Sequence, residues 1–72
     1  MKDAWSQVAD GSIAQETEVQ GLKRGVLQIA VSNAPLLSEL VAFHRIDLLE
    51  QIQANNPNLR IRNLKFVLQG RL

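Results

Sequence analysis

The segment GVLQIAVSNAPLLSELVAFHRIDLLEQI, residues 25–52, carries the strongest structural signal in the chain, because its hydrophobic period changes from two to about 3.6. In residues 26–31 Leu27, Ile29 and Val31 point to one face of a strand. They alternate with Val26, Gln28 and Ala30, which predicts a strand buried on one face. Asn33 and Pro35 then predict a helix start, since an asparagine caps first-turn amides and proline fits the first turn. The predicted inner residues of the strand and the helix are Leu27, Ile29, Val31, Leu37, Leu40, Val41, His44, Leu48 and Ile52.

The residues before this segment predict a short helix and a first strand. Trp5, Val8 and Ala9 share one side of a helix that Gly11 ends or bends. Residues 17–22 alternate as a strand, with Gly21 at a bulge that turns Leu22 inward. Residues 23–25 then form a turn, with glycine in the left-handed position, which closes a hairpin onto residues 26–31.

The residues after the long helix predict a turn and a last strand. The cluster NNPN at residues 55–58 must end the helix, because proline cannot continue it without losing a hydrogen bond. Residues 59–68 read as a strand with Leu64, Phe66 and Leu68 on the inner face, and Ile61 is out of phase with that set. The order helix, strand, strand, helix, strand predicts a single α+β domain over residues 1–72, a three-stranded sheet with helices on one face.

Composition sets limits on this domain. The chain has 72 residues, 46% of them hydrophobic, no cysteine and a net charge of +1. Disulfides and thiolate zinc sites are therefore excluded, and a core of this size stabilises the fold by only a few kcal/mol. The sequence has no run of 18 apolar residues and no signal-peptide pattern, so we expect a cytoplasmic protein.

Catalysis is not expected from this sequence. His44 is the only histidine, and no serine or cysteine stands in a nucleophile motif. The segment GLKRG at residues 21–25 is not a P-loop, because the lysine and serine or threonine that follow the glycines of that motif are missing. We therefore expect no enzyme activity, no metal and no cofactor.

The charges are distributed unevenly along the chain. Residues 1–22 hold Lys2 against four acids, whereas residues 51–72 hold four cations and no acid. Exposed cations on a turn and an edge strand bind phosphates in a salt-dependent way, although the same residues also protect an edge against aggregation. The candidate nucleic-acid-binding residues are Lys23, Arg24, Arg45, Arg60, Arg62, Lys65 and Arg71.

Two further features bear on the partner. Trp5, Phe43 and Phe66 are all predicted to face inward, so stacking on bases is weakly supported. Val26, Ala30 and Val67 would point away from the helices, and they support an alternative in which the chain is a protein interaction module or a homodimer with no nucleic-acid role.

The pattern of apolar positions, with one tryptophan and one glycine, resembles the DciA-type domain. The positions that carry the resemblance are Trp5, Val8, Ala9, Ile13, Ala14, Thr17, Val19, Leu22, Gly25, Leu27, Ile29, Val31, Glu39, Leu40, Leu48, Leu49, Ile52, Ile61, Leu64 and Phe66. The resemblance implies a KH-like fold and a noncatalytic adaptor that engages the bacterial replicative helicase and nucleic acid.

The sequence departs from that family's pattern at several positions. Asp10, Glu16 and Leu36 stand where the family has a glycine, a histidine and a bulky aromatic residue. True KH domains clamp nucleic acid with a G-x-x-G loop, but residues 44–46 contain no glycine, so another surface must make any such contact. Relatives commonly carry a flexible basic extension or a zinc ribbon; we expect neither here, and therefore weak DNA binding.

Overall fold

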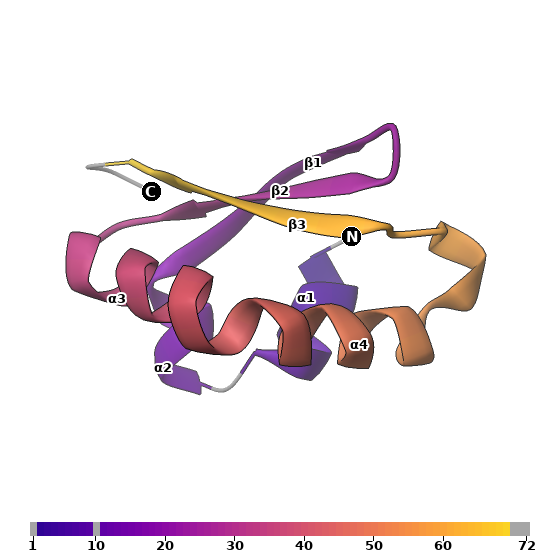
Figure 1. Cartoon of the computed structure of the whole chain (residues 1–72), viewed down its shortest axis with the longest axis horizontal. Coiled ribbons are helices and arrows are strands. Elements are labelled where there is room, and N and C mark those ends of the chain that lie inside the picture. The colour runs from indigo at the N-terminus through magenta and orange to yellow at the C-terminus, as the bar shows by residue number, and fades with distance from the viewer. Residues whose placement is uncertain (1, 10, 70–72) are drawn as a thin grey trace.

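The computed structural model describes residues 2–9 and 11–69, which fold into a three-stranded sheet with helices on one face (Figure 1). The strands are β1 (Thr17–Lys23), β2 (Val26–Val31) and β3 (Asn63–Leu68). β2 lies in the centre, antiparallel to β1 and parallel to β3. No helix of the described residues covers the opposite face of the sheet (Figure 1).

The helical elements follow the predicted order, and the predicted α+β class is confirmed. They are α1 (Lys2–Val8), α2 (Gly11–Gln15), α3 (Ala34–Glu39), the π-helical turn η1 (Leu40–His44), α4 (Arg45–Asn55) and the 3-10 turn η2 (Pro57–Leu59). The predicted break near Gly11 separates α1 from α2, and α4 ends at the predicted turn cluster. None of the helices in the described residues is long and apolar enough to cross a membrane.

The register of the sheet explains which residues form the core. Pairing of β1 with β2 shifts between Val19 and Gly21, which confirms the predicted bulge. Leu27, Ile29 and Val31 on β2 are fully buried against the helices, as predicted. Among the described residues, Leu40, Ile52 and Leu64 are the other large side chains that are fully or almost fully buried. Burial of such side chains contributes about 1.5 to 3 kcal/mol each.

The aromatic residues do not all face inward. The rings of Trp5 and Phe66 pack with their centroids 6.1 Å apart, as the prediction required. Phe43, by contrast, is 77% exposed, and Val41 and His44 are exposed as well, so these three inward predictions were wrong. The reason is the π-helical turn η1, whose wider spacing breaks the 3.6-residue period from which the prediction was made.

The last strand is shorter than predicted. β3 begins at Asn63 and not at residue 59, because Pro57–Leu59 forms a 3-10 turn and Arg60 adopts φ 54°, outside the extended region. Ile61 precedes the strand, which explains why it is out of phase with the alternation of Leu64, Phe66 and Leu68. Its side chain is nearly fully buried. Leu68, predicted to face inward, lies at the end of this edge strand and is 54% exposed.

Asn33 caps the long helical segment, as predicted. Its Oδ1 accepts a hydrogen bond of 2.8 Å from the Leu36 amide, and its Nδ2 donates to Glu16 Oε2 at 3.3 Å. The Ser32 hydroxyl donates to the same carboxylate oxygen. These hydrogen bonds, that of Ser32 first, lower the pKa of the Glu16 carboxyl below its ordinary value of 4.5. The residue before the start of β1 is thus tied to the helix start.

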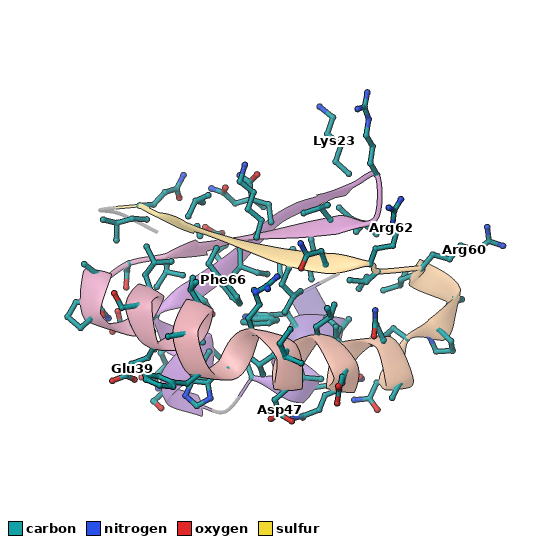
Figure 2. All side chains as sticks on the ribbon, in the orientation of Figure 1. Lys23, Glu39, Asp47, Arg60, Arg62 and Phe66 are labelled. Carbon is teal, nitrogen blue, oxygen red and sulfur yellow. The ribbon has the colours of Figure 1, made fainter. Side chains whose placement is uncertain are left out.

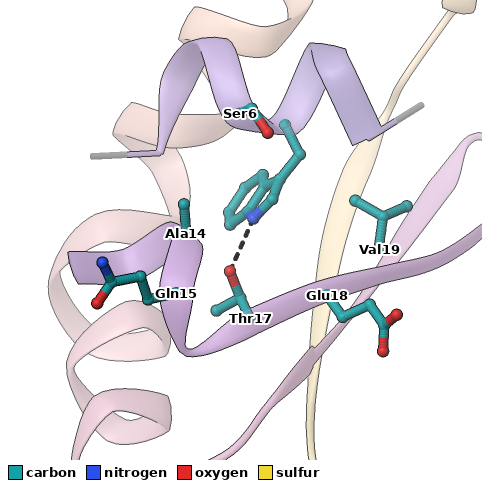
Figure 3. A pocket seen from close by; sticks show the side chains of 7 residues that line it. Ser6, Ala14, Gln15, Thr17, Glu18 and Val19 are labelled. Atoms are coloured by element: carbon teal, nitrogen blue, oxygen red, sulfur yellow. Dashed lines mark hydrogen bonds between the residues drawn. The ribbon is translucent and has the colours of Figure 1, made fainter. Parts of the chain in front are cut away.

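A chain of hydrogen bonds ties α1 and α2 to the start of β1. The indole Nε1 of Trp5 donates to the Thr17 hydroxyl at 2.9 Å, drawn as the dashed line in Figure 3. The Thr17 hydroxyl in turn donates to the Ile13 carbonyl at 2.7 Å. Both side chains are buried, so neither polar group can turn to water instead. A small pocket of about 300 Å³ opens beside this contact.

Replacing Thr17 therefore tests this hydrogen-bond chain. We expect Thr17→Val to lower the free energy of unfolding by about 2 kcal/mol, because it leaves the buried indole donor of Trp5 unpaired. Thr17→Ser keeps the hydroxyl and loses a methyl group, at a cost of about 0.8 kcal/mol. Urea unfolding followed by the fluorescence of Trp5 measures both. A valine variant at least as stable as the serine variant would contradict this account.

The Glu16 carboxylate predicts a pH-dependent stability. Because its pKa is lower in the folded than in the unfolded chain, it stabilises the fold above pH 4.5, and the contribution is lost as the pH falls through the folded-state pKa. The stability difference between wild type and Glu16→Gln should therefore shrink on acidification. Urea unfolding from about pH 7 to about pH 3 measures it.

The matched control is Glu18→Gln, which removes a carboxylate two residues away, on β1, and leaves the Ser32 and Asn33 contacts in place. A difference between wild type and Glu16→Gln that stays constant over this pH range would show that the hydrogen bonds do not depend on the charge.

Candidate nucleic-acid interface

The turn between β1 and β2 places two residues in the left-handed region. Arg24 has φ 55° and Gly25 has φ 80°, and they connect the paired residues Lys23 and Val26. Two successive positive φ angles are the signature of a type I′ hairpin, whose twist matches that of the strands. The glycine was predicted for this conformation, but the arginine was not, because asparagine or aspartate is the usual first residue.

The turn is fixed to the segment that precedes β3. The Gly25 carbonyl accepts hydrogen bonds from the amides of Arg62 at 2.6 Å and Asn63 at 3.2 Å. A Cβ at Gly25 would lie 2.7 Å from Cδ of Arg62 and 3.3 Å from the Arg60 carbonyl oxygen, so only glycine fits here. Residues far apart in the sequence are therefore held at one end of the sheet.

This arrangement gathers five of the seven predicted cations. Lys23 and Arg24 come from the hairpin, Arg60 and Arg62 from the segment before β3, and Lys65 from β3 itself. All five are exposed, and Lys23, Arg60 and Arg62 project from the same end of the sheet in Figure 2. We call these five residues the basic end.

A shallow groove joins the basic end to the open face of the sheet. It has a volume of about 900 Å³. Lys23, Arg24 and Lys65 border it, and the register places Lys65 beside Gln28. Its remaining lining residues are Gln20, Gly21, Leu22, Val26 and Gln28. The groove is wide and polar at its rim, which suits an extended polyanion better than a small enclosed ligand.

Of the other two predicted cations, Arg45 does not join the basic end. The guanidinium of Arg45 donates a 2.7 Å hydrogen bond from Nη1 to Asn63 Oδ1, and the residue is partly buried at the start of α4. Arg71 lies outside the described residues. Two acids lie toward the opposite end of the sheet: Glu18 on β1 pairs with Ala30, and Glu16, just before β1, contacts Ser32.

Two other expected features can be placed. Residues 44–46, where a KH domain would have its G-x-x-G loop, form continuous helix from η1 into α4, so these backbone amides do not form an open clamp. His44 is exposed on this helix. Across residues 2–9 and 11–69, no group of three His, Cys, Asp or Glu residues could hold a metal ion.

Sequence reasoning missed the conformation of Arg60. Its φ of 54° is left-handed and unfavourable for a side-chain-bearing residue by about 1 to 2 kcal/mol. The available signal was the out-of-phase Ile61 after the turn cluster at residues 55–58. That break in the alternation indicates that the strand does not run unbroken from residue 59, although no glycine stands near residue 60 to mark a left-handed position.

The chain is a small α+β domain that gathers exposed cations at one end of its sheet. The family model described as Dna[CI] antecedent, DciA, matches residues 1–66. The chain therefore belongs to the DciA family. Membership implies a helicase-loader-like role in bacterial DNA replication and a partnership with the helicase, and the family is not a known enzyme family. No curated protein matches the chain.

The left-handed conformation of Arg24 predicts a stabilising substitution. We expect Arg24→Asn to raise the free energy of unfolding by about 1 kcal/mol, because asparagine adopts this conformation at lower cost. Lys23→Asn is the matched control, since residue 23 ends the strand and has no such strain to relieve. Urea unfolding measures both variants. Loss of stability in Arg24→Asn would contradict the assigned turn geometry.

Proposed function

We propose that this chain is the noncatalytic nucleic-acid-binding module of a helicase-loading adaptor, acting in the cytoplasm as one domain and holding the phosphate backbone at its basic end. The observation that carries the proposal is the convergence of five exposed cations from three segments on one end of the sheet. Arginine forks and lysine ammonium groups are the usual phosphate ligands of such surfaces.

The two left-handed arginines support this proposal. Arg24 and Arg60 occupy conformations that other residues adopt more easily, and both project into solvent from the basic end. Local strain of this kind is concentrated at functional sites, where the side chain matters more than its backbone preference. The cost is acceptable here because the hydrogen bonds of the Gly25 carbonyl hold the adjoining segment in place.

The proposal concerns the backbone of the nucleic acid and not its bases. Trp5 and Phe66 pack in the core, and Phe43 lies on the helical side of the molecule. The described part of the open sheet face thus offers no aromatic platform for stacking. We therefore expect binding with little sequence preference. Arg45 should add little, since its guanidinium is engaged with Asn63.

The alternative of a homodimer through the open sheet face receives less support. Ala30 has no exposed surface, and Val26 and Val67 are partly buried, so this face has little apolar area to bury. Stable interfaces bury about 800 Å² on each partner. Sedimentation at micromolar concentration distinguishes the two: a stable dimer that covers Lys23 and Lys65 would favour the alternative over nucleic-acid binding.

A salt titration tests the proposed contact with DNA. With up to five phosphate contacts, we expect the affinity for duplex DNA to fall with a log-log slope of about −4.5 against salt concentration. Replacing Lys23, Arg24, Arg60 and Arg62 with glutamine should remove most of this slope, about one unit for each residue. Glutamine keeps methylene groups next to Gly25, where the Arg62 side chain packs.

Gel shifts with single-stranded and duplex DNA, at several salt concentrations, provide the measurement. Arg45→Gln is the matched control, because it removes the same charge outside the basic end. The proposal is wrong if the quadruple variant and the wild type bind alike, or if Arg45→Gln weakens binding as much as Arg62→Gln does.

A further inference from the structure

The π-helical turn η1 determines which side chains of the long helical segment reach the core. Leu40 at its start is fully buried, and Arg45, five residues later, turns toward β3 to reach Asn63. Leu48 and Ile52 continue this buried line along α4. A π turn uses five residues where an α-helical turn uses four, so the residues between Leu40 and Arg45 are carried to the outer side.

The consequence is an exposed apolar pair on the outer side of the helices. Phe43 is 77% exposed and Ile46 is 57% exposed, and the two are three residues apart, which makes them neighbours on a helix. The other two aromatic residues of the chain pack against each other in the core. An aromatic ring left in water beside a second large apolar side chain is typical of an interaction surface.

Carboxylates surround this pair. Glu39 lies four residues before Phe43 and Asp47 four residues after it, about one turn in each direction. Both lie on the side of the helices that faces away from the sheet (Figure 2). Glu50 is exposed one further turn along, and Arg45, the one cation among residues 34–55, is engaged with Asn63. We call the surface of Glu39, Phe43, Ile46, Asp47 and Glu50 the acidic helix face.

We propose that the acidic helix face docks a basic amphipathic helix of a protein partner. Phe43 and Ile46 would pack against apolar residues of that helix, and the carboxylates would pair with its lysines and arginines. Recognition of amphipathic helices depends on apolar anchors at helical spacing, and complementary charge around the anchors selects the partner and its orientation. This inference rests on the proposed adaptor function, for which it names the surface that meets the protein partner.

The negative charge of the acidic helix face favours this occupant over others. Nucleic acid is a polyanion and would be repelled by the three carboxylates. A second copy docking by the same face would set acid against acid across the interface. The basic end of a second copy is complementary in charge, but it carries lysines and arginines in place of large apolar anchors.

A labelled synthetic peptide provides the first test. The probe is a helix of about 18 residues with leucine at the i, i+3, i+4 and i+7 positions and lysine elsewhere, and the control probe has glutamate in place of every lysine. We expect fluorescence anisotropy to show binding of the lysine peptide alone. Phe43→Ser should weaken this binding about tenfold, and Asp47→Lys should weaken it as well.

Leu68→Ser is the matched control variant, because it removes an exposed apolar side chain from β3, away from this face. Circular dichroism and urea unfolding confirm that each variant folds, which we expect for substitutions at exposed positions. The proposal is overturned if the wild type does not bind the lysine peptide, if it binds the glutamate peptide equally well, or if Phe43→Ser binds as tightly as Leu68→Ser.

A second arm with the purified replicative helicase separates this inference from the proposed function. If the wild type and Leu68→Ser bind the helicase and Phe43→Ser binds at least tenfold more weakly, the acidic helix face is the docking site. If all three bind equally, the face is not that site and the inference is wrong. If the wild type binds the peptide but not the helicase, the adaptor function fails and the helix-binding face stands.

Discussion

The carbonyl oxygen of Gly25 makes the interaction on which most of this structure depends. By accepting the amides of Arg62 and Asn63, it joins the β1–β2 hairpin to the start of β3. The parallel pairing that follows, Val26 with Asn63 and Leu27 with Leu64, takes its register from this contact. A parallel pair lacks a tight turn to set its register, and here the backbone of the hairpin turn provides it. The same contact determines where the cations of the basic end meet.

The molecule that results has two faces of opposite character. The basic end gathers its cations around the hairpin and the start of β3, whereas the acidic helix face lies on the helices, away from the sheet. The net charge of +1 conceals this separation, because the opposite charges cancel in the sum and not in space. In solution of physiological ionic strength, charges farther apart than about 8 Å are largely screened from each other. Each face can therefore attract its own class of partner, which is what an adaptor between a protein and a nucleic acid requires.

Much of the fold could be predicted from the sequence, because its local signals agree with its tertiary contacts. The alternation in β2 placed Leu27, Ile29 and Val31 inward, and the Asn33 cap and the Gly21 bulge lie where the pattern put them. The grouping of the candidate cations could be predicted only in part from the sequence. The sequence indicated a stripe beside the hairpin turn, but the backbone contact at Gly25 that creates it joins segments about 37 residues apart and has no local signature.

The π-helical turn η1 could not be predicted from the hydrophobic period, for a physical reason. A period of 3.6 residues assumes an unbroken α-helix, and it places Val41 and His44 beside Leu40 and Leu48. One extra residue in the turn keeps Leu48 and Ile52 buried but moves Phe43 into solvent, so the error was confined to the residues of η1. Nothing in the residue types of that segment distinguishes the two geometries.

The residues that depart from their usual backbone conformation or burial lie on the surface of the molecule and not in the core. Arg24 and Arg60 adopt left-handed conformations at the basic end, and Phe43 is exposed on the acidic helix face. Each is unfavourable by an amount on the order of 1 kcal/mol, which is a substantial fraction of the stability of a domain of this size. Buried contacts beside each one, the Gly25 carbonyl in the first case and Leu40 in the second, hold these conformations in place. A sequence selected for stability alone would gain by placing asparagine at residue 24 and would lose little by placing a polar residue at 43. The residues present are better explained by the binding roles proposed for the two faces.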